Sequence, residues 1–248
     1  MTDNDCDEPV VSEQDGIRYL HFDSPWIQGA MDLKRPSRLV LSYTEQMMAW
    51  LLFFEPQRHA TIGQLGLGAG SLTRFCHHHL PNPQVVIERN AAVISVCQRY
   101  FRLPAAARLA VVQADAQHWV AQPENWDTLS VLMVDLYDTD ARGPVCDDLA
   151  FYEGCWRVLT EPGMISVNLF GQHDSFAGNL DRLHKVFGPR LVMLPPVDEG
   201  NQVVLGFKGP ALSLSRQQLL ARADEVEQRW QLPALRWARS IDLACFRA

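Results

Sequence analysis

Residues 62–70 have the sequence Ile-Gly-Gln-Leu-Gly-Leu-Gly-Ala-Gly, and Ser-Leu-Thr-Arg-Phe follows at 71–75. This order predicts a short apolar strand, a glycine turn and the start of a helix. Glycine has no Cβ, so Gly66, Gly68 and Gly70 would let a ligand approach the backbone. The outward amides of the helix start add a partial positive charge. Open α/β sheets bind nucleotide-like ligands at such a turn, although a turn that binds nothing stays open as an alternative.

An acidic residue follows the glycine turn at the sequence spacing that is typical of a ribose-binding carboxylate. Glu88 ends the next apolar run, 84–88, about twenty residues past the last glycines. A carboxylate at the tip of a second strand is placed to accept hydrogen bonds from both hydroxyls of a ribose. Ser71 stands where a dinucleotide fingerprint has its third glycine, so the pattern favours a nucleoside without a pyrophosphate, such as S-adenosylmethionine or a relative.

The chain beyond the turn alternates strands and helices. Apolar strands without a polar alternation, such as 129–134, indicate burial on both faces in a parallel sheet. The short link between the last two strands favours an antiparallel hairpin at the sheet edge. We predict an α/β protein with a Rossmann-like, seven-stranded, mostly parallel sheet and helices on both faces, as in class I S-adenosylmethionine-dependent methyltransferases. The strands are expected at 62–67, 84–88, 108–113, 129–135, 164–170, 190–195 and 202–208, and the helices at 71–80, 90–101, 147–159, 174–187 and 215–230.

The segment before the glycine turn divides into three parts. Residues 1–15 are acidic and unpatterned and are expected to form a disordered tail. Residues 16–42 predict a small β-hairpin unit, with a turn at 23–25 and a third strand at 39–41. Residues 43–54 predict a helix that is apolar on most sides, and therefore buried against the sheet or a second subunit. The Rossmann-like domain would span 43–248.

Size and composition restrict the class of protein. The 248 residues fit one large domain with a small appendage, and 47% apolar residues allow a substantial core. A net charge of −7 disfavours a nucleic-acid partner. The six cysteines are scattered and contain no C-x-x-C pair, which indicates a reducing compartment. We see no signal peptide or long apolar run, so we expect a cytoplasmic protein with no membrane partner.

Carboxylates follow two further strands. Asp115 and Ala116 come after the third strand, where the carboxylate would accept a hydrogen bond from an adenine amino group; an N-cap of the next helix is the alternative. Asp135, Asp138 and Asp140 place three carboxylates within six residues after the fourth strand. Their repulsion requires a cation or a shared proton. No histidine lies near them in sequence, so we expect no metal site and favour an amine substrate.

These motifs together resemble the spermidine synthases, or polyamine aminopropyltransferases. The resemblance extends from about residue 16 to 207. It consists of Asp135-Leu136-Tyr137-Asp138 at the spacing of the family's D-S-S-D, Gly143-Pro144 after it, Phe151-Tyr152 at the next helix, Pro162-Gly163 before the fifth strand, and Tyr43-x-Glu45 at the linking helix.

The resemblance implies transfer of an aminopropyl group from decarboxylated S-adenosylmethionine, a co-substrate rather than a permanently bound cofactor, to a diamine such as putrescine. If the roles of the family's residues apply at the matching positions of this chain, Glu88 would hold the ribose and Asp115 would hold the adenine. Asp135 would be the base, or the group that orients the attacking amine, because a protonated amine cannot attack a sulfonium carbon. The remaining substrate-binding residues would be Asp138 at the distal ammonium, Tyr43 at the amine and Tyr137 in its pocket. Family likeness also implies a homodimer.

The chain departs from the family pattern at three places, and at one of them Thr44 replaces the Gln or His that is common beside the tyrosine. Ala69 stands where the family's glycine loop has an Asp that anchors the donor's amine, and Leu136-Tyr137 replace two serines. Intact S-adenosylmethionine would be tolerated beside Ala69, so a methyltransferase with an unknown acceptor remains an alternative. A non-catalytic nucleoside-binding homologue is the third possible function, and the short N-terminal unit favours it.

Overall fold

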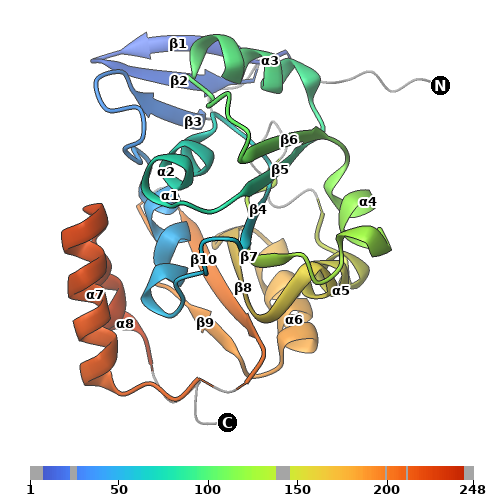
Figure 1. Cartoon of the computed structure of the whole chain (residues 1–248), viewed down its shortest axis with the longest axis vertical. Helices are drawn as coiled ribbons and strands as arrows, with labels where there is room; N and C mark the ends of the chain where they lie inside the picture. The colour runs from blue at the N-terminus through green and yellow to red at the C-terminus, as the bar shows by residue number, and fades with distance from the viewer. Residues whose placement is uncertain (1–7, 23–26, 138–145, 199, 211, 243–248) are drawn as a thin grey trace.

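The computed structural model describes residues 8–22, 27–137, 146–198, 200–210 and 212–242. Its strands form two sheets, a three-stranded antiparallel sheet in the order β1-β2-β3 and a seven-stranded sheet in the order β6-β5-β4-β7-β8-β10-β9. Figure 1 shows the small sheet above the edge of the large sheet that carries β6 and β5. The strands of the small sheet are β1 (Val10–Gln14), β2 (Ile17–His21) and β3 (Ile27–Asp32).

The large sheet confirms the predicted α/β architecture. Its first five strands are parallel, and β10 is antiparallel to both β8 and β9. The predicted terminal hairpin is therefore present, with β9 at the edge. The strands are β4 (Thr61–Leu65), β5 (Gln84–Glu88), β6 (Leu109–Gln113), β7 (Leu129–Val134), β8 (Leu159–Phe170), β9 (Leu191–Met193) and β10 (Asn201–Lys208).

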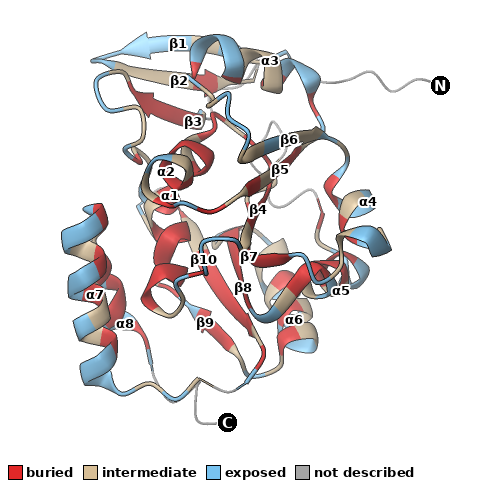
Figure 2. Cartoon of the chain, viewed as in Figure 1, coloured by how far each residue is buried: buried red, intermediate tan, exposed pale blue. Residues whose placement is uncertain are grey.

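Helices cover both faces of this sheet (Figure 1). Alternate residues of β7 enter different core clusters: Val131 and Met133 pack with α1, η1, α2, α7 and α8, whereas Leu132 and Val134 pack with α4, α5 and α6. Figure 2 shows the buried strands between helices whose outer faces are exposed. The helical elements are α1 (Ser42–Met47), η1 (Met48–Leu52), α2 (Ser71–His79), α3 (Ala91–Tyr100), α4 (Ala116–Ala121), η2 (Pro123–Asn125), α5 (Leu149–Val158), α6 (Ser175–Phe187), α7 (Arg216–Trp230) and α8 (Ala234–Ser240).

The N-terminal unit differs from the prediction. It is a three-stranded sheet, and its extra strand is β1, so the predicted tail at 1–15 is wrong for Val10–Gln14. Asp15 and Gly16 have φ of 53° and 79° and join β1 to β2 as a two-residue turn. Asp-Gly is a typical sequence of such a turn. The predicted strand at 39–41 is absent, while residues 1–7 and the expected turn at 23–25 lie outside the described residues.

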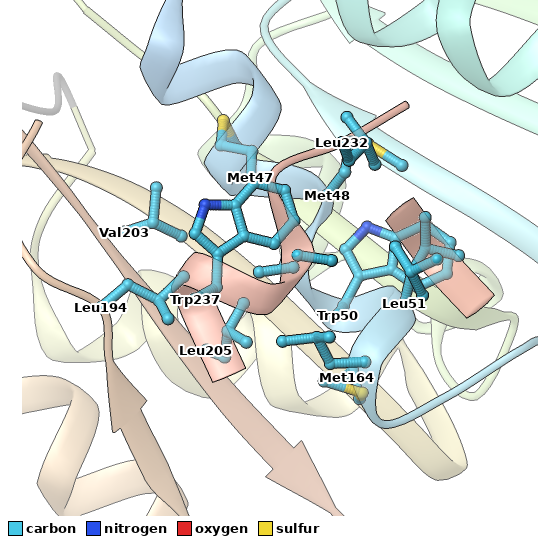
Figure 3. Packing of buried hydrophobic residues seen from close by; sticks show 14 of the residues in the cluster. Met47, Met48, Trp50, Leu51, Met164, Leu194, Val203, Leu205, Leu232 and Trp237 are labelled. Carbon is cyan, nitrogen blue, oxygen red and sulfur yellow. The ribbon is translucent and has the colours of Figure 1, made fainter. Parts of the chain in front are cut away.

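The apolar segment 42–52 is buried by the chain itself. It begins as α1 and tightens into the 3₁₀ helix η1, rather than forming one helix over 43–54. Trp50 is fully buried, and Trp237 of α8 lies in the same cluster on this side of the sheet (Figure 3). The segment therefore packs between its own sheet and the C-terminal helices, so a homodimer cannot use the face that they cover. The division at residues 42 and 43 into two units stays a prediction.

None of the helices in the described ranges has the length and apolarity needed to cross a membrane.

The packing of the C-terminal helices predicts a mutational effect. Trp237→Ala should lower the free energy of unfolding by about 3–5 kcal/mol, because it empties a buried indole site beneath η1. Met193→Ala at the exposed sheet edge is the control and should change it by less than about 0.5 kcal/mol. Urea denaturation measures both, and equal effects would contradict the burial of α8.

Candidate active site

The predicted glycine turn connects β4 to α2. Gly66, Gly68 and Gly70 all have positive φ, at 87°, 50° and 70°. A Cβ added to Gly66 would lie 2.1 Å from the carbonyl oxygen of Asp135. The Gly66 amide donates to the Ile87 carbonyl at 2.8 Å, and the Asp135 amide donates to the Leu65 carbonyl at 3.0 Å. The tips of β4, β5 and β7 therefore meet in direct backbone contact.

Two side chains hold this turn from the protein interior. Gln64 is buried on β4 and donates to the Gly66 carbonyl at 2.6 Å, while its own carbonyl accepts from the Thr73 hydroxyl at 2.8 Å. The buried guanidinium of Arg74 donates to the carbonyls of Ala69, Pro36 and Phe101. Burial lowers the pKa of Arg74 to about 10. Arg74 thus ties the turn to the segment that follows β3 and to the end of α3 through neutral partners.

Glu88 lies at the predicted strand tip beside the turn. Its carboxylate accepts from the Leu67 amide at 2.9 Å and from the Asn90 amide at 2.8 Å. A carboxylate has about four lone-pair sites, so two further hydrogen bonds are possible. This position agrees with the predicted contact to a ribose, which stays a prediction.

Asp115 is the N-cap of α4. Its side chain accepts from the His118 amide at 2.8 Å, so the N-cap alternative is confirmed. The residue is exposed at the tip of β6, two strands from the glycine turn. Ala116 is buried with its methyl group in the core, so only its backbone could face a ligand. The adenine contact predicted for both residues is compatible with these positions and remains a prediction.

Asp135 follows β7 and is the centre of a polar row along this edge of the sheet. Its carboxylate accepts from the Asn168 amide of β8 at 2.9 Å and from the Tyr43 hydroxyl of α1. Asn201 at the start of β10 donates to the Asn168 carbonyl at 3.1 Å. Sequence reasoning did not single out Asn168 or Asn201, although a polar residue within the apolar run 164–170 was a signal of a buried hydrogen bond.

The surroundings of Asp135 change its acidity. The residue as a whole is partly exposed, but its carboxylate lies deep among protein atoms. Burial raises its pKa to about 6, while the hydrogen bonds from Asn168 and Tyr43 oppose part of this rise. Above that pH the group is an anion of higher basicity than a surface aspartate, which is what a proton acceptor requires.

The structure thus brings together the glycine turn, Glu88, Asp135 and Tyr43. Tyr137 follows Asp135 by two residues and lies next to the same polar row. The predicted roles of Asp138 and of Gly143-Pro144 fall outside the described residues. In the described ranges, His, Cys, Asp and Glu side chains form no group of three or more that could hold a metal ion.

The N-terminal sheet forms one wall of the turn. A Cβ added to Gly29 of β3 would lie 2.5 Å from the Ala69 Cβ and 2.8 Å from the Ala69 amide nitrogen. The Ser71 hydroxyl donates to the Ala30 carbonyl at 2.8 Å. Ala69 is only 2% exposed, so its methyl group packs on β3 at the position where the resemblance expects an aspartate.

This geometry can be compared with known proteins. No family model matches the chain. The polyamine aminopropyltransferase of Chromobacterium violaceum is 34% identical over 227 residues, which cover 91% of this chain and 85% of that protein. The chain belongs to the polyamine aminopropyltransferase family. The corresponding protein of Neisseria meningitidis is 31% identical over 91% of this chain and 85% of its own length.

Solved structures share the fold of this aminopropyltransferase family member. A probable spermidine synthase from Corynebacterium glutamicum has a TM-score of 0.68 at 17% identity, covering 87% of this chain and 83% of that one. A spermidine synthase in complex with the transition state analogue AdoDATO has a TM-score of 0.60 at 18% identity, covering 90% and 88%. Human Methyltransferase-like protein 13, in complex with SAH, has a TM-score of 0.69 at 22% identity, covering 77% of this chain and 93% of that one. The predicted resemblance and fold are confirmed.

The contact between β3 and the turn predicts that Gly29→Ala lowers the free energy of unfolding by about 1–3 kcal/mol, since its methyl group would overlap Ala69. Gly178→Ala in α6 is the matched control. Its Cβ would meet only the end of the Arg182 side chain, so it should be neutral or stabilising by up to about 1 kcal/mol. Equal effects in denaturant titrations would contradict the contact.

The hydrogen bond from Asn168 predicts a second effect. Removing it in Asn168→Ala should raise the pKa of Asp135 above about 6, because a donor to the carboxylate stabilises its charged form. A ¹³C NMR titration of the Asp135 carboxyl would measure the shift. Asn179→Ala is the control, since that buried amide bonds to Tyr152 and should leave the Asp135 titration unchanged. An unshifted titration in Asn168→Ala would contradict the assignment.

Proposed function

We propose that this protein transfers the aminopropyl group of decarboxylated S-adenosylmethionine to a diamine such as putrescine and releases methylthioadenosine. Family membership supports this reaction class. The observation that carries the proposal is the position of Asp135, a buried carboxylate of raised pKa in backbone contact with the glycine turn. A nucleoside-binding turn and a general base adjoin at one point, as a transfer from a nucleoside to an amine requires.

The donor would lie over the tips of β4 and β5. The glycine turn would contact the nucleoside, Glu88 would accept from the ribose hydroxyls, and Asp115 with the Ala116 backbone would face the adenine. Glu88 and the Leu67 amide already hold each other in place. The ribose would therefore meet a preformed acceptor, which reduces the ordering cost of binding.

The acceptor would lie on the other side of Asp135, toward β8 and β10. Its attacking nitrogen forms a bond to the aminopropyl carbon, and the carbon–sulfur bond breaks with its electron pair on sulfur. The nitrogen's proton passes to Asp135. Burial has already raised the pKa of Asp135 to about 6, and loss of water around a bound alkylammonium would lower its pKa from about 10, so the site narrows the difference between the two groups. Tyr43 would orient the amine, and Asp138 would bind the distal ammonium.

Methyl transfer from intact S-adenosylmethionine is the second candidate. One observation favours it: position 69 beside the turn carries a buried methyl group instead of a carboxylate that would repel the methionine carboxylate. Loss of all catalysis is less favoured, because a non-catalytic protein has no need of a buried carboxylate at the strand tip. We also propose, from family likeness, a cytoplasmic homodimer whose interface lies away from the segment 42–52.

Product analysis tests the reaction. With decarboxylated S-adenosylmethionine and putrescine, the protein should form spermidine and methylthioadenosine in equal amounts. Asp135→Asn should lower kcat about 10²- to 10⁴-fold. It should not lower thermal stability at pH 8, because a carboxyl whose pKa is raised on folding is most costly in its charged form. Glu153→Gln on the outer face of α5 is the control. Methylated product from intact S-adenosylmethionine, without spermidine, would contradict the proposal.

A further inference from the structure

Gln46 of α1 is a buried polar side chain within an apolar part of the molecule. It is 2% exposed, and the two residues that follow it, Met47 and Met48, belong to the hydrophobic cluster on this side of the sheet (Figure 3). A buried amide costs free energy of folding unless its carbonyl and its NH₂ group both find partners. An apolar side chain would fill the same space without that cost, so packing alone does not account for a glutamine here.

The Gln46 amide bridges the two arms of the β9–β10 hairpin where they diverge. Its NH₂ group donates to the Pro195 carbonyl at 2.9 Å, and its carbonyl accepts from the Val203 amide at 3.4 Å. The Leu194 amide donates to the Val203 carbonyl at 2.9 Å. Pro195 comes next and has no N–H with which to continue the ladder. Gln46 therefore holds both arms of the hairpin at the end of their pairing.

The strand residue that Gln46 holds lies beside the polar row at Asp135. Val203 is directly opposite Asn168 in the pairing of β10 with β8. Residues paired in this way point to the same face of a sheet and are close neighbours. Asn168 is 1% exposed, and its amide donates to the Asp135 carboxylate at 2.9 Å. Asn201, two residues before Val203 on β10, donates to the Asn168 carbonyl at 3.1 Å.

A second hydrogen bond anchors α1 next to the same position. The Ser166 hydroxyl of β8 is fully buried and donates to the Met47 carbonyl at 2.9 Å. Ser166 precedes Asn168 by two residues, so both side chains point to the face of the sheet that α1 covers. Helix α1 is therefore attached to the sheet at two points next to Asn168, to β8 through Ser166 and to β10 through Gln46.

We propose that Gln46 and Ser166 are positioning residues, which hold β8 and β10 against α1 so that the Asn168 amide stays within hydrogen-bonding distance of the Asp135 carboxylate. This inference rests on the proposed function, in which Asp135 accepts the proton of the attacking amine. Such a base must be held in a fixed orientation, because the amine has to attack in line with the breaking carbon–sulfur bond. Gln46 and Ser166 are buried and act through Asn168 rather than on the substrates.

Gln46→Met keeps the length of the side chain and removes both of its hydrogen bonds. It should raise the pKa of Asp135 by about 0.5–1 from its value of about 6, because a displaced donor stabilises the charged carboxylate less. A ¹³C NMR titration of the Asp135 carboxyl measures this rise without turnover. In spermidine formation, kcat/KM should fall about two- to fivefold at pH 6, where more of the base is protonated, and by less than about twofold at pH 8.

A double variant tests whether the effect passes through Asn168. In Gln46→Met combined with Asn168→Ala, the Asp135 titration should equal that of Asn168→Ala alone, because the donor that Gln46 positions is already absent. Shifts that add in the double variant would overturn the inference, since Gln46 would then act on Asp135 by another route.

Asn82→Ala is the matched control. Asn82 is 1% exposed, and its amide donates to the carbonyls of Gln57 and Ala60 at 2.7 and 2.9 Å, before the first residues of β4 and β5. Its loss should lower the melting temperature, as Gln46→Met does, and leave the Asp135 titration unchanged. A titration that shifts equally in both variants, or in neither, would overturn the inference.

Ser166→Ala is the variant to use if Gln46→Met does not fold. It removes one hydroxyl and should shift the Asp135 titration in the same direction, and an unshifted titration would overturn the inference. If the parent protein forms no spermidine, the proposed function fails separately. The NMR titrations then still decide whether Gln46 and Ser166 position the donor to Asp135.

Discussion

The contact between Gly66 and the backbone of Asp135 is the constraint on which the site depends. A side chain of any size at position 66 would separate the tips of β4 and β7, because the space that its Cβ requires is occupied by the Asp135 carbonyl. With glycine there, the β4 and β7 backbones stay paired to their last residues, and Gly66 also reaches Ile87 at the end of β5. The nucleoside turn, Glu88 and Asp135 are therefore brought together by sheet geometry rather than by a flexible loop.

The close packing of the tips of β4, β5 and β7 also affects the charge of Asp135. Asp135 lies at the strand tip between the turn and the Asn168–Asn201 row, where its charge is poorly solvated and its pKa rises. Its partners there, Tyr43 and Asn168, are neutral donors, which orient the carboxylate without neutralising it. Among the described residues, the buried guanidinium of Arg74 beneath the turn donates to carbonyls and to the Ser71 hydroxyl rather than to Asp135.

Much of the fold could be predicted because local patterns and global architecture agree. The apolar runs of β5 and β7 and the glycine turn identified the sheet, and the helix expected at 215–230 is present as α7. Strand β1 was missed because its residues are mostly exposed and acidic neighbours hide any alternation, although Asp15-Gly16 carried a turn signal. Helix α4, with six residues, was too short for a helical period to be visible.

Site residues that directly follow a strand could be predicted from the sequence. Site residues whose role is a hydrogen bond between neighbouring strands could not. Glu88 and Asp135 could be placed from sequence, because parallel strands end at one edge of a sheet. Asn168 and Asn201 could not, since their role depends on β10 entering beside β8 from the far end of the chain. The burial of Ala69 against Gly29 likewise depends on how the small sheet packs on the turn, which no local pattern encodes.

A crystal structure with methylthioadenosine and putrescine bound together would test the central claim most directly. The account predicts the ribose at Glu88, the thioether sulfur over the glycine turn, and one putrescine nitrogen within hydrogen-bonding distance of the Asp135 carboxylate, with the diamine on the β8 side. A nucleoside bound elsewhere, or a diamine that makes no contact with Asp135, would contradict it.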